Sequence, residues 1–307
     1  MTKIFIDGSA GTTGLRIHER LAGRKDIELM LLSEELRKNA DARQEMLNNA
    51  DIAFLCLPDA AAIEAVGMVE NKNTAIIDTS TAHRTNEQWV YGFPEISGNR
   101  DKIANSKRVA NPGCHASGVV ALIAPLVEKE ILGCDTLLSA VSLTGYSGGG
   151  KKMIAEYEDE DRNVLLDAPR MYGIGQKHKH LPEILKVCGL SSAPVFMPIV
   201  APYYSGMEVT IPLHIKEISG TAEDIKKVYR EYYTSGLVRY ADEADESGFV
   251  SAGAFANRDD MQITVCGNEE RILLISRFDN LGKGASGSAI QNMNILLGID
   301  ETTGLNV

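Results

Sequence analysis

The sequence has few cysteines, and their spacing excludes two kinds of stabilising chemistry. Over 307 residues there are only five, at Cys56, Cys114, Cys134, Cys188 and Cys266. None forms a CxxC or CxxxC pair, so no structural zinc site is expected, and their odd number and wide spacing do not suggest a disulfide framework. We therefore predict no bound metal and a location in the reducing cytoplasm.

Long apolar runs and an excess of positive charge are also missing. No apolar run approaches the roughly 18 residues of a membrane span, and because the first residues enter a β pattern at once, no signal peptide is expected. The formal net charge is −11 without any long basic cluster, so neither a nucleic acid nor a membrane is an expected partner. With 44% hydrophobic and 24% charged residues, the composition is that of a globular protein, long enough for two domains.

The first 110 residues alternate between strand and helix patterns. The predicted strands are 3–7, 27–32, 51–57, 74–78 and 108–110. The run 51–57 is almost wholly apolar, which is typical of buried parallel strands. This alternation predicts an α/β fold with a doubly wound, Rossmann-like parallel sheet, whose ligands bind at the carboxyl ends of the strands.

A glycine-rich turn follows the first predicted strand and precedes a helix pattern. Gly8, Gly11 and Gly14 have the spacing G-x-x-G-x-x-G. Backbone N–H groups in such a turn can hold the pyrophosphate of a dinucleotide. We therefore predict that these glycines, with Thr12 and Thr13, bind the cofactor, and a purely structural tight turn is the alternative.

The residues after the second predicted strand bear on the choice of cofactor. An acidic residue directly after it would hold the ribose 2′-hydroxyl of NAD. Here Ser33 comes first, and Arg37 and Lys38 follow. A hydroxyl and two cations favour a 2′-phosphate and hence NADP(H). The carboxylates of Glu34 and Glu35 would instead favour NAD. The alternative to a cofactor site is a solvated loop of mixed charge.

Cys114 is the candidate nucleophile. It stands between the predicted strand 108–110 and a helical pattern over 119–127, which we expect Pro125 to break. The positive end of a helix and its free N–H groups favour a thiolate, which is the nucleophile for acyl chemistry. The alternative is a small buried cysteine that only packs.

A histidine pair is the candidate acid–base group. His178 and His180 are separated by one residue, and Glu183 follows three residues after His180. No cysteine or carboxylate stands at metal-ligand spacing from the pair, so acid–base chemistry near Cys114 is the preferred interpretation. Glu183 could orient a histidine, and a structural histidine is the alternative for each.

Two further segments could bind anions. Ser80 and Arg84 follow a predicted strand, and Arg84 could clamp a phosphate or carboxylate, with a surface salt bridge as the alternative. Ser147 and Gly148 lie in a run of glycines that ends at Lys151. Glycines, a serine and lysines at a helix start can cradle an anion, and a flexible linker is the alternative.

The second half of the chain has longer β patterns. They cover 136–144, 194–201, 207–215, 262–266 and 272–278, with an amphipathic helix at 222–233. Their hairpin-like spacing predicts a mainly antiparallel sheet in an α+β catalytic domain. A last helix through Leu297 is predicted to return to the first domain. We thus expect an NADP-binding domain of residues 1–112 plus 285–307 and a catalytic domain of residues 113–284.

Six motifs together resemble one known family. They are residues 8–14, 78–84, 91–95, 111–114, 145–150 and 178–183. In this order they resemble the shorter form of the N-acetyl-γ-glutamyl-phosphate reductases, within the aspartate-semialdehyde dehydrogenase-like superfamily. One departure is visible, because the family usually has Tyr or Phe directly after the nucleophile and this chain has His115.

The resemblance implies a reaction and a set of roles. The reaction is reduction of N-acetyl-L-glutamyl 5-phosphate by NADPH to the 5-semialdehyde and phosphate, in arginine biosynthesis, by a homo-oligomer (dimer or tetramer). Cys114 would form a thioester, and His180 or His178 would exchange the proton. The resemblance also places Ser80, Ser147, Gly148, Gly284 and Asn292 at the cofactor, and Arg84, Asn111, Lys151 and Glu183 at the substrate.

Two other readings stay open on the sequence alone. One is a related enzyme, an aspartate-semialdehyde or glyceraldehyde-3-phosphate dehydrogenase, which the segment 178–183 disfavours. The other is a non-catalytic NADP-binding regulator. Cys114 at a helix start disfavours it, because that position is typical of a reactive thiol.

Overall fold

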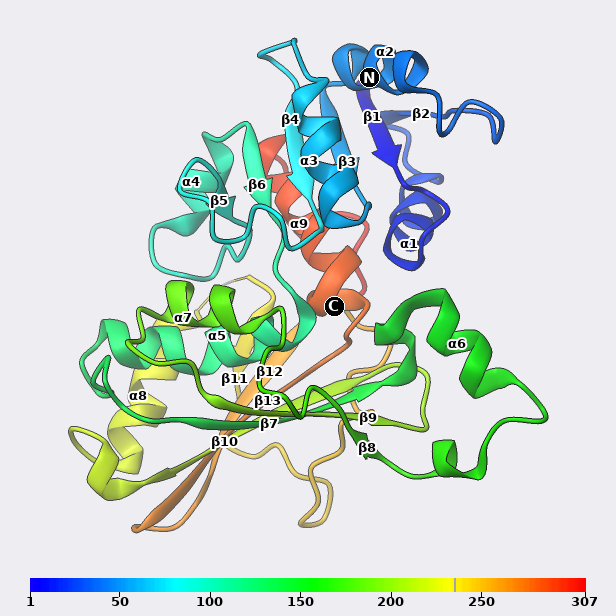
Figure 1. The fold of residues 1–307 in the computed structure, drawn as a ribbon. Helices are drawn as coiled ribbons and strands as arrows, with labels where there is room; N and C mark the ends of the chain where they lie inside the picture. The colour runs from blue at the N-terminus through cyan, green and yellow to red at the C-terminus, as the bar shows by residue number, and fades with distance from the viewer. Residues whose placement is uncertain (235) are drawn as a thin grey trace. The chain divides into compact units, whose positions relative to one another are not determined.

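The computed structural model describes residues 1–234 and 236–307 and divides the chain into two units (Figure 1). The first unit contains Met1–Pro94, Gly98–Pro112 and Ala285–Leu305, and the second contains Glu95–Ser97, Gly113–Gly284 and Asn306–Val307. The predicted domain ranges differ from these units at 95–97 and at 306–307. Glu95 joins the second unit because its carboxylate lies 2.7 Å from the buried ammonium of Lys283, and the Asn306 N–H donates to Asp259 at 2.8 Å.

The first unit contains a six-stranded sheet in the order β2-β1-β3-β4-β6-β5, in which every pair is parallel. Its strands are β1 (Thr2–Asp7), β2 (Ile27–Met30), β3 (Ile52–Leu55), β4 (Ala75–Asp78), β5 (Val90–Tyr91) and β6 (Arg108–Ala110). The strand order reverses at β1, which has β2 on one side and β3 on the other. The carboxyl ends of β1 and β3 therefore form the switch point at which such sheets bind ligands.

This sheet confirms the predicted doubly wound architecture, although two strands are shorter than predicted. Pairing of β2 with β1 ends where Met30 lies opposite Phe5, so residues 31 and 32 are outside the strand. Pairing of β3 ends at Leu55, and Cys56 lies just beyond it.

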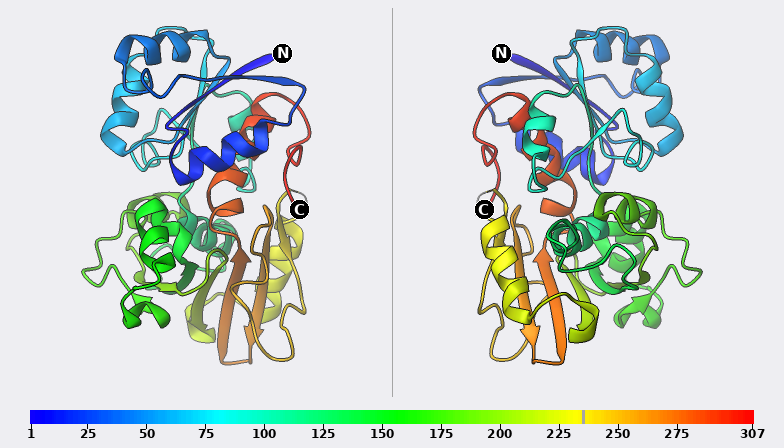
Figure 2. Two further views of the ribbon diagram at one scale, coloured as in Figure 1. Left: turned by 90° about the vertical axis from the view of Figure 1, so that its right-hand side faces the viewer. Right: turned by 90° about the vertical axis from the view of Figure 1, so that its left-hand side faces the viewer.

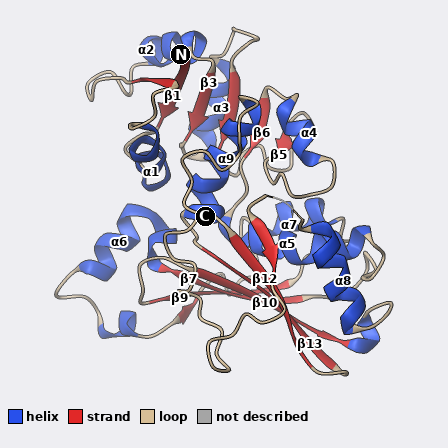
Figure 3. Ribbon diagram, turned by 180° about the vertical axis from the view of Figure 1, so that it is seen from behind, coloured by secondary structure: helices blue, strands red, loops and turns tan. Residues whose placement is uncertain are grey.

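Helices cover both faces of the first sheet (Figures 1 and 3). They are α1 (Thr12–Leu21), α2 (Ala40–Asn49), α3 (Asp59–Gly67), α4 (Asn99–Ala104) and α9 (Gly287–Leu296). Successive residues of a strand point to opposite faces, so Ile4 packs with α1 and α9 residues while Phe5 packs with α2 and α3 residues. Helix α9 contributes Ala289, Ile290 and Met293 to this core, although it follows the second sheet in the sequence.

The second unit contains a seven-stranded mixed sheet in the order β11-β12-β13-β10-β7-β9-β8. Its strands are β7 (Ser139–Gly145), β8 (Arg170–Met171), β9 (Val195–Ala201), β10 (Met207–His214), β11 (Val238–Tyr240), β12 (Met261–Gly267) and β13 (Arg271–Phe278). Neighbouring strands are antiparallel except for the pairs β7–β9 and β11–β12. The predicted mainly antiparallel sheet is confirmed. Strand β7 begins three residues later than predicted, because the Thr136 N–H bonds Gly133 in a turn.

The helices of the second unit are α5 (Cys114–Glu128), α6 (Gly150–Glu158), α7 (Leu181–Cys188) and α8 (Ala222–Tyr232). Short helical turns occupy Tyr146–Gly149, Val164–Asp167, Ile215–Glu217 and, with π-helical bonding, Gly282–Ser286. Helix α8 packs beside β11 and β12 (Figure 2). Helix α5 packs on β10 and β13 at Gly118, where a Cβ atom would come within 2.5 Å of Val209. None of the described helices is long and apolar enough to cross a membrane.

The prediction that Pro125 breaks the helix is wrong. Helix α5 continues through Pro125 to Glu128. A proline has no N–H, so the carbonyl of Ala121 loses its helical partner. The Tyr233 hydroxyl donates to that carbonyl at 2.7 Å, and the Tyr229 hydroxyl donates to the next carbonyl, of Leu122, at 2.6 Å. Tyr233 thus satisfies the acceptor that the proline frees, and Tyr229 adds a hydrogen bond to the next carbonyl.

Candidate active site

Cys114 is the first residue of α5, a helix of 15 residues. The preceding residue, Gly113, is the N-cap and has no side chain to occupy the first-turn N–H groups. The side chain of Cys114 is partly exposed. A partly exposed thiol at the positive end of a long helix is a site where a thiolate is stabilised.

Three histidine rings gather beside this helix start. The ring centroids of His178 and His180 are 4.7 Å apart, and that of His115 lies 5.5 Å from the first and 5.6 Å from the second. The Phe196 ring packs edge-on against His115 and His178. The pair 178 and 180 is therefore close to the residue that follows the nucleophile, as acid–base chemistry at Cys114 requires.

Glu183 connects this histidine group to the main chain at the nucleophile. Its Oε2 accepts a hydrogen bond from the Gly113 N–H at 3.2 Å. Its Oε1 lies 3.9 Å from His180 Nε2, and the Glu183 side chain is 1% exposed. A buried carboxylate at this distance can orient the His180 ring.

The other two histidines are held neutral. Burial, and to a smaller extent the charge of Lys179, lowers the pKa of His178 to about 4. Burial, followed by the charges of His178 and Lys179, lowers the pKa of His115 to about 3. Desolvation penalises the charged imidazole at both residues, so both are neutral at pH 7.

Two residues that contact His115 belong to no sequence pattern that predicts a functional site. Ser142 of β7 lies 2.6 Å from His115 Nδ1, and Tyr172, directly after β8, lies 2.6 Å from His115 Nε2. Neither residue belongs to a motif, and only the pairing of β7, β8 and β9 brings them to His115. The departure from the family pattern at His115 was the one available hint.

Gly284 lies against the nucleophile from another side. A Cβ atom on Gly284 would come within 2.9 Å of the Cβ of Cys114. The glycine belongs to the π-helical turn Gly282–Ser286, a kind of turn that is frequent at functional sites. Close approach to Cys114 is thus one reason for a glycine here.

Three predicted site residues are not joined to the cysteine–histidine group. Ser147 is buried and accepts a hydrogen bond from Asn280 Nδ2 at 3.0 Å. A Cβ on Gly148 would lie 3.3 Å from Thr144 Oγ1, and Lys151 is exposed in the first turn of α6. In the part of the chain that the structure describes, none of the three bonds Cys114 or the histidines, and their roles stay predictions.

In the first unit, the predicted phosphate turn lines a cavity of about 820 Å³ at the switch point. Gly8 has φ 89°, and a Cβ there would lie 2.3 Å from the Cys56 carbonyl oxygen. A Cβ on Gly14 would lie 2.4 Å from the Gly8 carbonyl oxygen. A tight turn alone therefore explains two of the glycines.

Gly11 is different, and it favours a ligand. Its φ is −73°, and a Cβ there would have 3.4 Å to its nearest neighbour, so the fold itself tolerates a side chain. Gly11 lines the cavity and is the N-cap of α1, without a side chain that caps the first turn. Open N–H groups at Thr12 and Thr13 fit the pyrophosphate of a dinucleotide.

Charged residues surround the rest of this cavity. Arg37 lies 3.0 Å from Glu34, and both side chains are exposed. Arg43 of α2, for which no sequence pattern predicts a role, pairs with the buried carboxylate of Asp7 at 2.9 Å. Hydrogen bonding to Ser33 lowers the pKa of Glu35. The cavity thus has cations for a phosphate, partly compensated by carboxylates.

Four predicted polar residues of the first unit form hydrogen bonds around β4 and β6. Ser80 Oγ donates to Asp78 at 2.7 Å. Arg84 Nε donates to the Asn111 carbonyl at 2.9 Å, and the Asn111 side chain accepts from Asn292 Nδ2 at 3.1 Å. Asn292 Oδ1 is buried and accepts no hydrogen bond among the described residues. An unused buried acceptor fits the amide hydrogens of a nicotinamide carboxamide.

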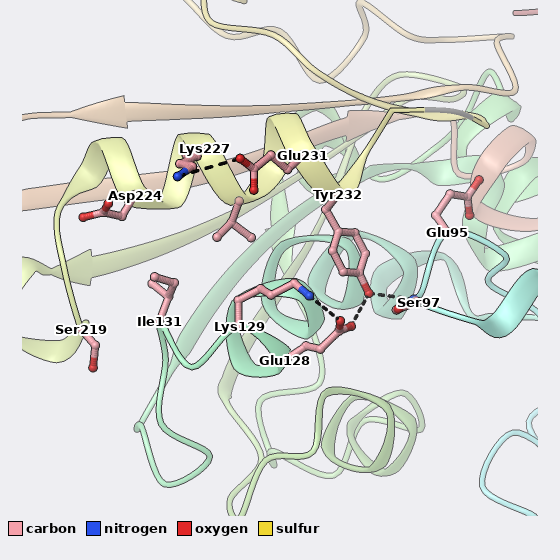
Figure 4. A pocket seen from close by; sticks show the side chains of 11 residues that line it. Glu95, Ser97, Glu128, Lys129, Ile131, Ser219, Asp224, Lys227, Glu231 and Tyr232 are labelled. Atoms are coloured by element: carbon pink, nitrogen blue, oxygen red, sulfur yellow. Dashed lines mark hydrogen bonds and ion pairs between the residues drawn. The ribbon is translucent and has the colours of Figure 1, made fainter.

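A further hollow of about 710 Å³ in the second unit has no thiol or imidazole in its lining (Figure 4). Two of its carboxylates have partners, since Glu128 accepts from Tyr232 at 2.7 Å and Asp224 accepts from the Thr221 N–H at 2.8 Å. No group of three or more metal-binding side chains occurs among residues 1–234 and 236–307.

The remaining cysteines are in other surroundings. Burial raises the pKa of Cys56 to about 12, and burial also raises the pKa of Cys188. Cys188 is the last residue of α7. Cys134 is exposed, but it lies in a loop rather than at the start of a helix.

Comparison with known proteins agrees with this arrangement. Residues 32–106 match the family described as "Semialdehyde dehydrogenase, NAD binding domain", and residues 114–280 match "Semialdehyde dehydrogenase, dimerisation domain". A curated relative from Nostoc sp., N-acetyl-gamma-glutamyl-phosphate reductase 2, is 43% identical over 99% of both chains.

Solved structures share the fold at low sequence identity. Aspartate semialdehyde dehydrogenase II from Vibrio cholerae has a TM-score of 0.71 at 14% identity, covering 97% of this chain and 98% of its own. The enzyme from Candida albicans, solved with NADP, has a TM-score of 0.68 at 17% identity, with the same coverage. By identity over nearly its full length, the chain belongs to the N-acetyl-γ-glutamyl-phosphate reductase family of semialdehyde dehydrogenases.

Proposed function

We propose that this protein uses NADPH to reduce N-acetyl-L-glutamyl 5-phosphate to N-acetyl-L-glutamate 5-semialdehyde, with release of phosphate. Family membership supports the reaction. The observation that carries the mechanism is Cys114 at the start of α5, with Glu183 bonded to the residue before it. This arrangement provides a nucleophile and an anchored acid–base pair in one unit.

The Cys114 thiolate attacks the acyl carbon of the substrate. A C–S bond forms, the C–O bond to the phosphate breaks, and phosphate leaves with its electron pair. The first-turn N–H groups of α5 stabilise the negative oxygen of the tetrahedral state. The product of this half-reaction is a thioester on Cys114.

His180 is the residue that we assign as the acid–base group, in preference to His178. The lowered pKa of His178, about 4, leaves it without a proton to give at neutral pH. His180 has the buried carboxylate of Glu183 at 3.9 Å, which can orient its ring toward the substrate. It would protonate the alkoxide after reduction and take the proton back as the C–S bond breaks to give the aldehyde.

The first unit would hold the cofactor. Gly8, Gly11, Thr12 and Thr13 fit the pyrophosphate, and Asn292 Oδ1 fits the carboxamide. When bound, NADPH supplies the hydride that reduces the thioester carbon. Ser33, Arg37 and Lys38 support a preference for the 2′-phosphorylated cofactor.

We further propose that the protein is a homo-oligomer (dimer or tetramer) of the cytoplasm. The match of residues 114–280 to a dimerisation domain supports association. Light scattering coupled to gel filtration tests it, and a monomer at micromolar concentration would contradict it.

The reaction is tested in the oxidative direction. Phosphate-dependent reduction of NADP is measured with N-acetylglutamate semialdehyde and, in parallel, with aspartate semialdehyde. We expect turnover with the first compound only. Equal turnover with both, or turnover without phosphate, would contradict the proposal in favour of a different semialdehyde dehydrogenase.

A further inference from the structure

His115 is the buried centre of a chain of three hydrogen-bonded side chains. Its Nδ1 lies 2.6 Å from Ser142 Oγ, and its Nε2 lies 2.6 Å from Tyr172 Oη. His115 is 2% exposed and Ser142 is 0% exposed, so neither can replace its partner with bulk water. The position of each hydrogen therefore follows from a count of donors and acceptors.

Ser142 decides which nitrogen of His115 carries the hydrogen. A neutral imidazole has one N–H and one acceptor nitrogen, and a hydroxyl has one hydrogen to donate. Among the described residues, His115 Nδ1 is the only side-chain hydrogen-bond partner of Ser142. If Nδ1 carried the hydrogen, the Ser142 hydrogen would be buried without an acceptor, which is unfavourable. Both buried hydrogens of this pair are used when Ser142 donates to Nδ1, and the ring hydrogen is then on Nε2.

This tautomer leaves the hydrogen of Tyr172 available. Nε2–H donates to Tyr172 Oη, which acts as the acceptor. Tyr172 makes no other side-chain hydrogen bond within the described chain, and its side chain is partly exposed. Burial, followed by the charge of Cys114, raises the pKa of Tyr172, so the hydroxyl keeps its hydrogen at neutral pH.

We propose that Ser142 and His115 hold the Tyr172 hydroxyl as a hydrogen-bond donor to the carbonyl oxygen of the acyl group held at Cys114. His115 is then a positioning residue that acts through Tyr172, and the hydrogen stays on the tyrosine throughout. The identity of the acyl group rests on the proposed function, whereas the tautomer does not.

The location and chemistry of the chain support this assignment. His115 directly follows Cys114 in α5, so Tyr172 is held by the neighbour of the nucleophile. A donor that stabilises an oxyanion works best when it is oriented before the reaction and needs no rearrangement. The lowered pKa of His115, about 3, keeps its ring neutral, as a single ring N–H requires.

The tautomer is measured first, on the wild-type protein without substrate. Long-range ¹H–¹⁵N correlation spectra of the imidazoles at pH 7 distinguish Nε2–H from Nδ1–H, and the His115 signals are those missing from H115F. We expect Nε2–H for His115. In S142A, a second tautomer should appear, because the donor to Nδ1 is gone, whereas S139A on the same strand should leave the spectrum unchanged. Nδ1–H in the wild type, or an unchanged tautomer in S142A, would overturn the inference.

Kinetics then tests the donor role. Y172F should lower kcat about 100-fold, as the loss of one oxyanion donor does, while KM stays nearly constant. H115F should lower kcat by at least about tenfold, and the double variant should be no slower than Y172F, because the two residues act as one unit. Additive losses, an effect on KM alone, or unchanged kcat in Y172F would refute the proposal.

The design separates this inference from the proposed function. NADPH binding and circular dichroism establish that each variant is folded, and S142A removes only one hydroxyl if H115F is unstable. If the protein does not reduce the N-acetylated acyl phosphate, the proposed function fails while the wild-type tautomer can still be read. Observation of the Nδ1–H tautomer at His115 in the wild type would overturn the inference, whichever substrate the protein uses.

Discussion

The candidate cofactor site of the first unit is made mainly of main chain, whereas the candidate active site of the second unit is made of side chains. Residues 8–14 provide a turn and a helix start within one short segment. The active site takes Cys114 from α5, Ser142 from β7, Tyr172 from the residue after β8, and His180 with Glu183 from the start of α7. The first site depends on local geometry, and the second depends on the pairing of distant segments.

This difference predicts that the two sites can be disabled separately, and the largest effect concerns Cys114. C114S should lose at least about 1,000-fold in turnover, because an alcohol is a much poorer nucleophile at neutral pH. Its affinity for NADPH, measured by fluorescence titration, should stay within about twofold of the wild type, since no described residue of the turn at 8–14 is changed.

C134S is the matched control, because Cys134 is exposed but lies outside the candidate active site. It should keep wild-type turnover. Substrate should protect Cys114, and not Cys134, from iodoacetamide. Near wild-type turnover of C114S would exclude a covalent mechanism.

The glycines of the first site should separate stability from binding. G8A should lower the free energy of unfolding by about 2–3 kcal/mol, because Gly8 has φ 89° and no room for a Cβ. G11A should change it by less than about 0.5 kcal/mol, yet weaken NADPH binding at least about tenfold, because its methyl group occupies the cavity.

Urea unfolding and NADPH titration of both variants measure these effects. If G11A binds NADPH as tightly as the wild type, the turn at 8–14 is structural only. The contrast between a site made of main chain and one made of side chains would then be lost.

Acid should destabilise the second unit through His115. Its pKa in the folded state, about 3, lies below the ordinary value of 6.5. The unfolded chain therefore binds more protons between these values, and stability falls as the pH drops below 6.5. From pH 7 to pH 5 this one group should remove about 2 kcal/mol of stability.

H115F lacks this titration and is the comparison. Urea unfolding at pH 7 and pH 5 should show a smaller acid loss in H115F than in the wild type. Equal losses would mean that His115 is not neutral in the folded protein, contrary to the hydrogen-bond chain with Ser142 and Tyr172.

The same contrast explains what the sequence could predict. The parallel sheet and the turn at 8–14 follow from local patterns, because strand, glycine turn and helix are adjacent in the chain. Cys114 was found for the same reason, since a helix start is local. Ser142 and Tyr172 could not be found, because only the strand pairing of the second sheet brings them to His115.

Errors in the sequence-based prediction have the same origin. Pro125 was expected to end a helix, since a proline locally removes a hydrogen bond. The compensation comes from Tyr233, more than 100 residues away in the chain. Local rules fail where a distant residue supplies the missing partner.

The smallest expected effect concerns the side chains around the main-chain site, and it tests whether that site also selects its ligand. Arg37 follows β2 and lines the cavity, with its guanidinium 3.0 Å from Glu34. A cation that contacts the 2′-phosphate should discriminate NADPH from NADH about tenfold, or about 1.4 kcal/mol. R37A should therefore lose most of the preference for NADPH while its affinity for NADH stays constant, and E34A should strengthen NADPH binding because Arg37 is released from its partner.

Titration of both variants with NADPH, NADH and 2′,5′-ADP measures these affinities, with K186A of α7 as a control that removes a cation from the second unit. If R37A lost affinity for NADPH and NADH equally, Arg37 would stabilise the loop rather than contact the 2′-phosphate. The preference for NADPH would then have to come from the main chain or from Arg43.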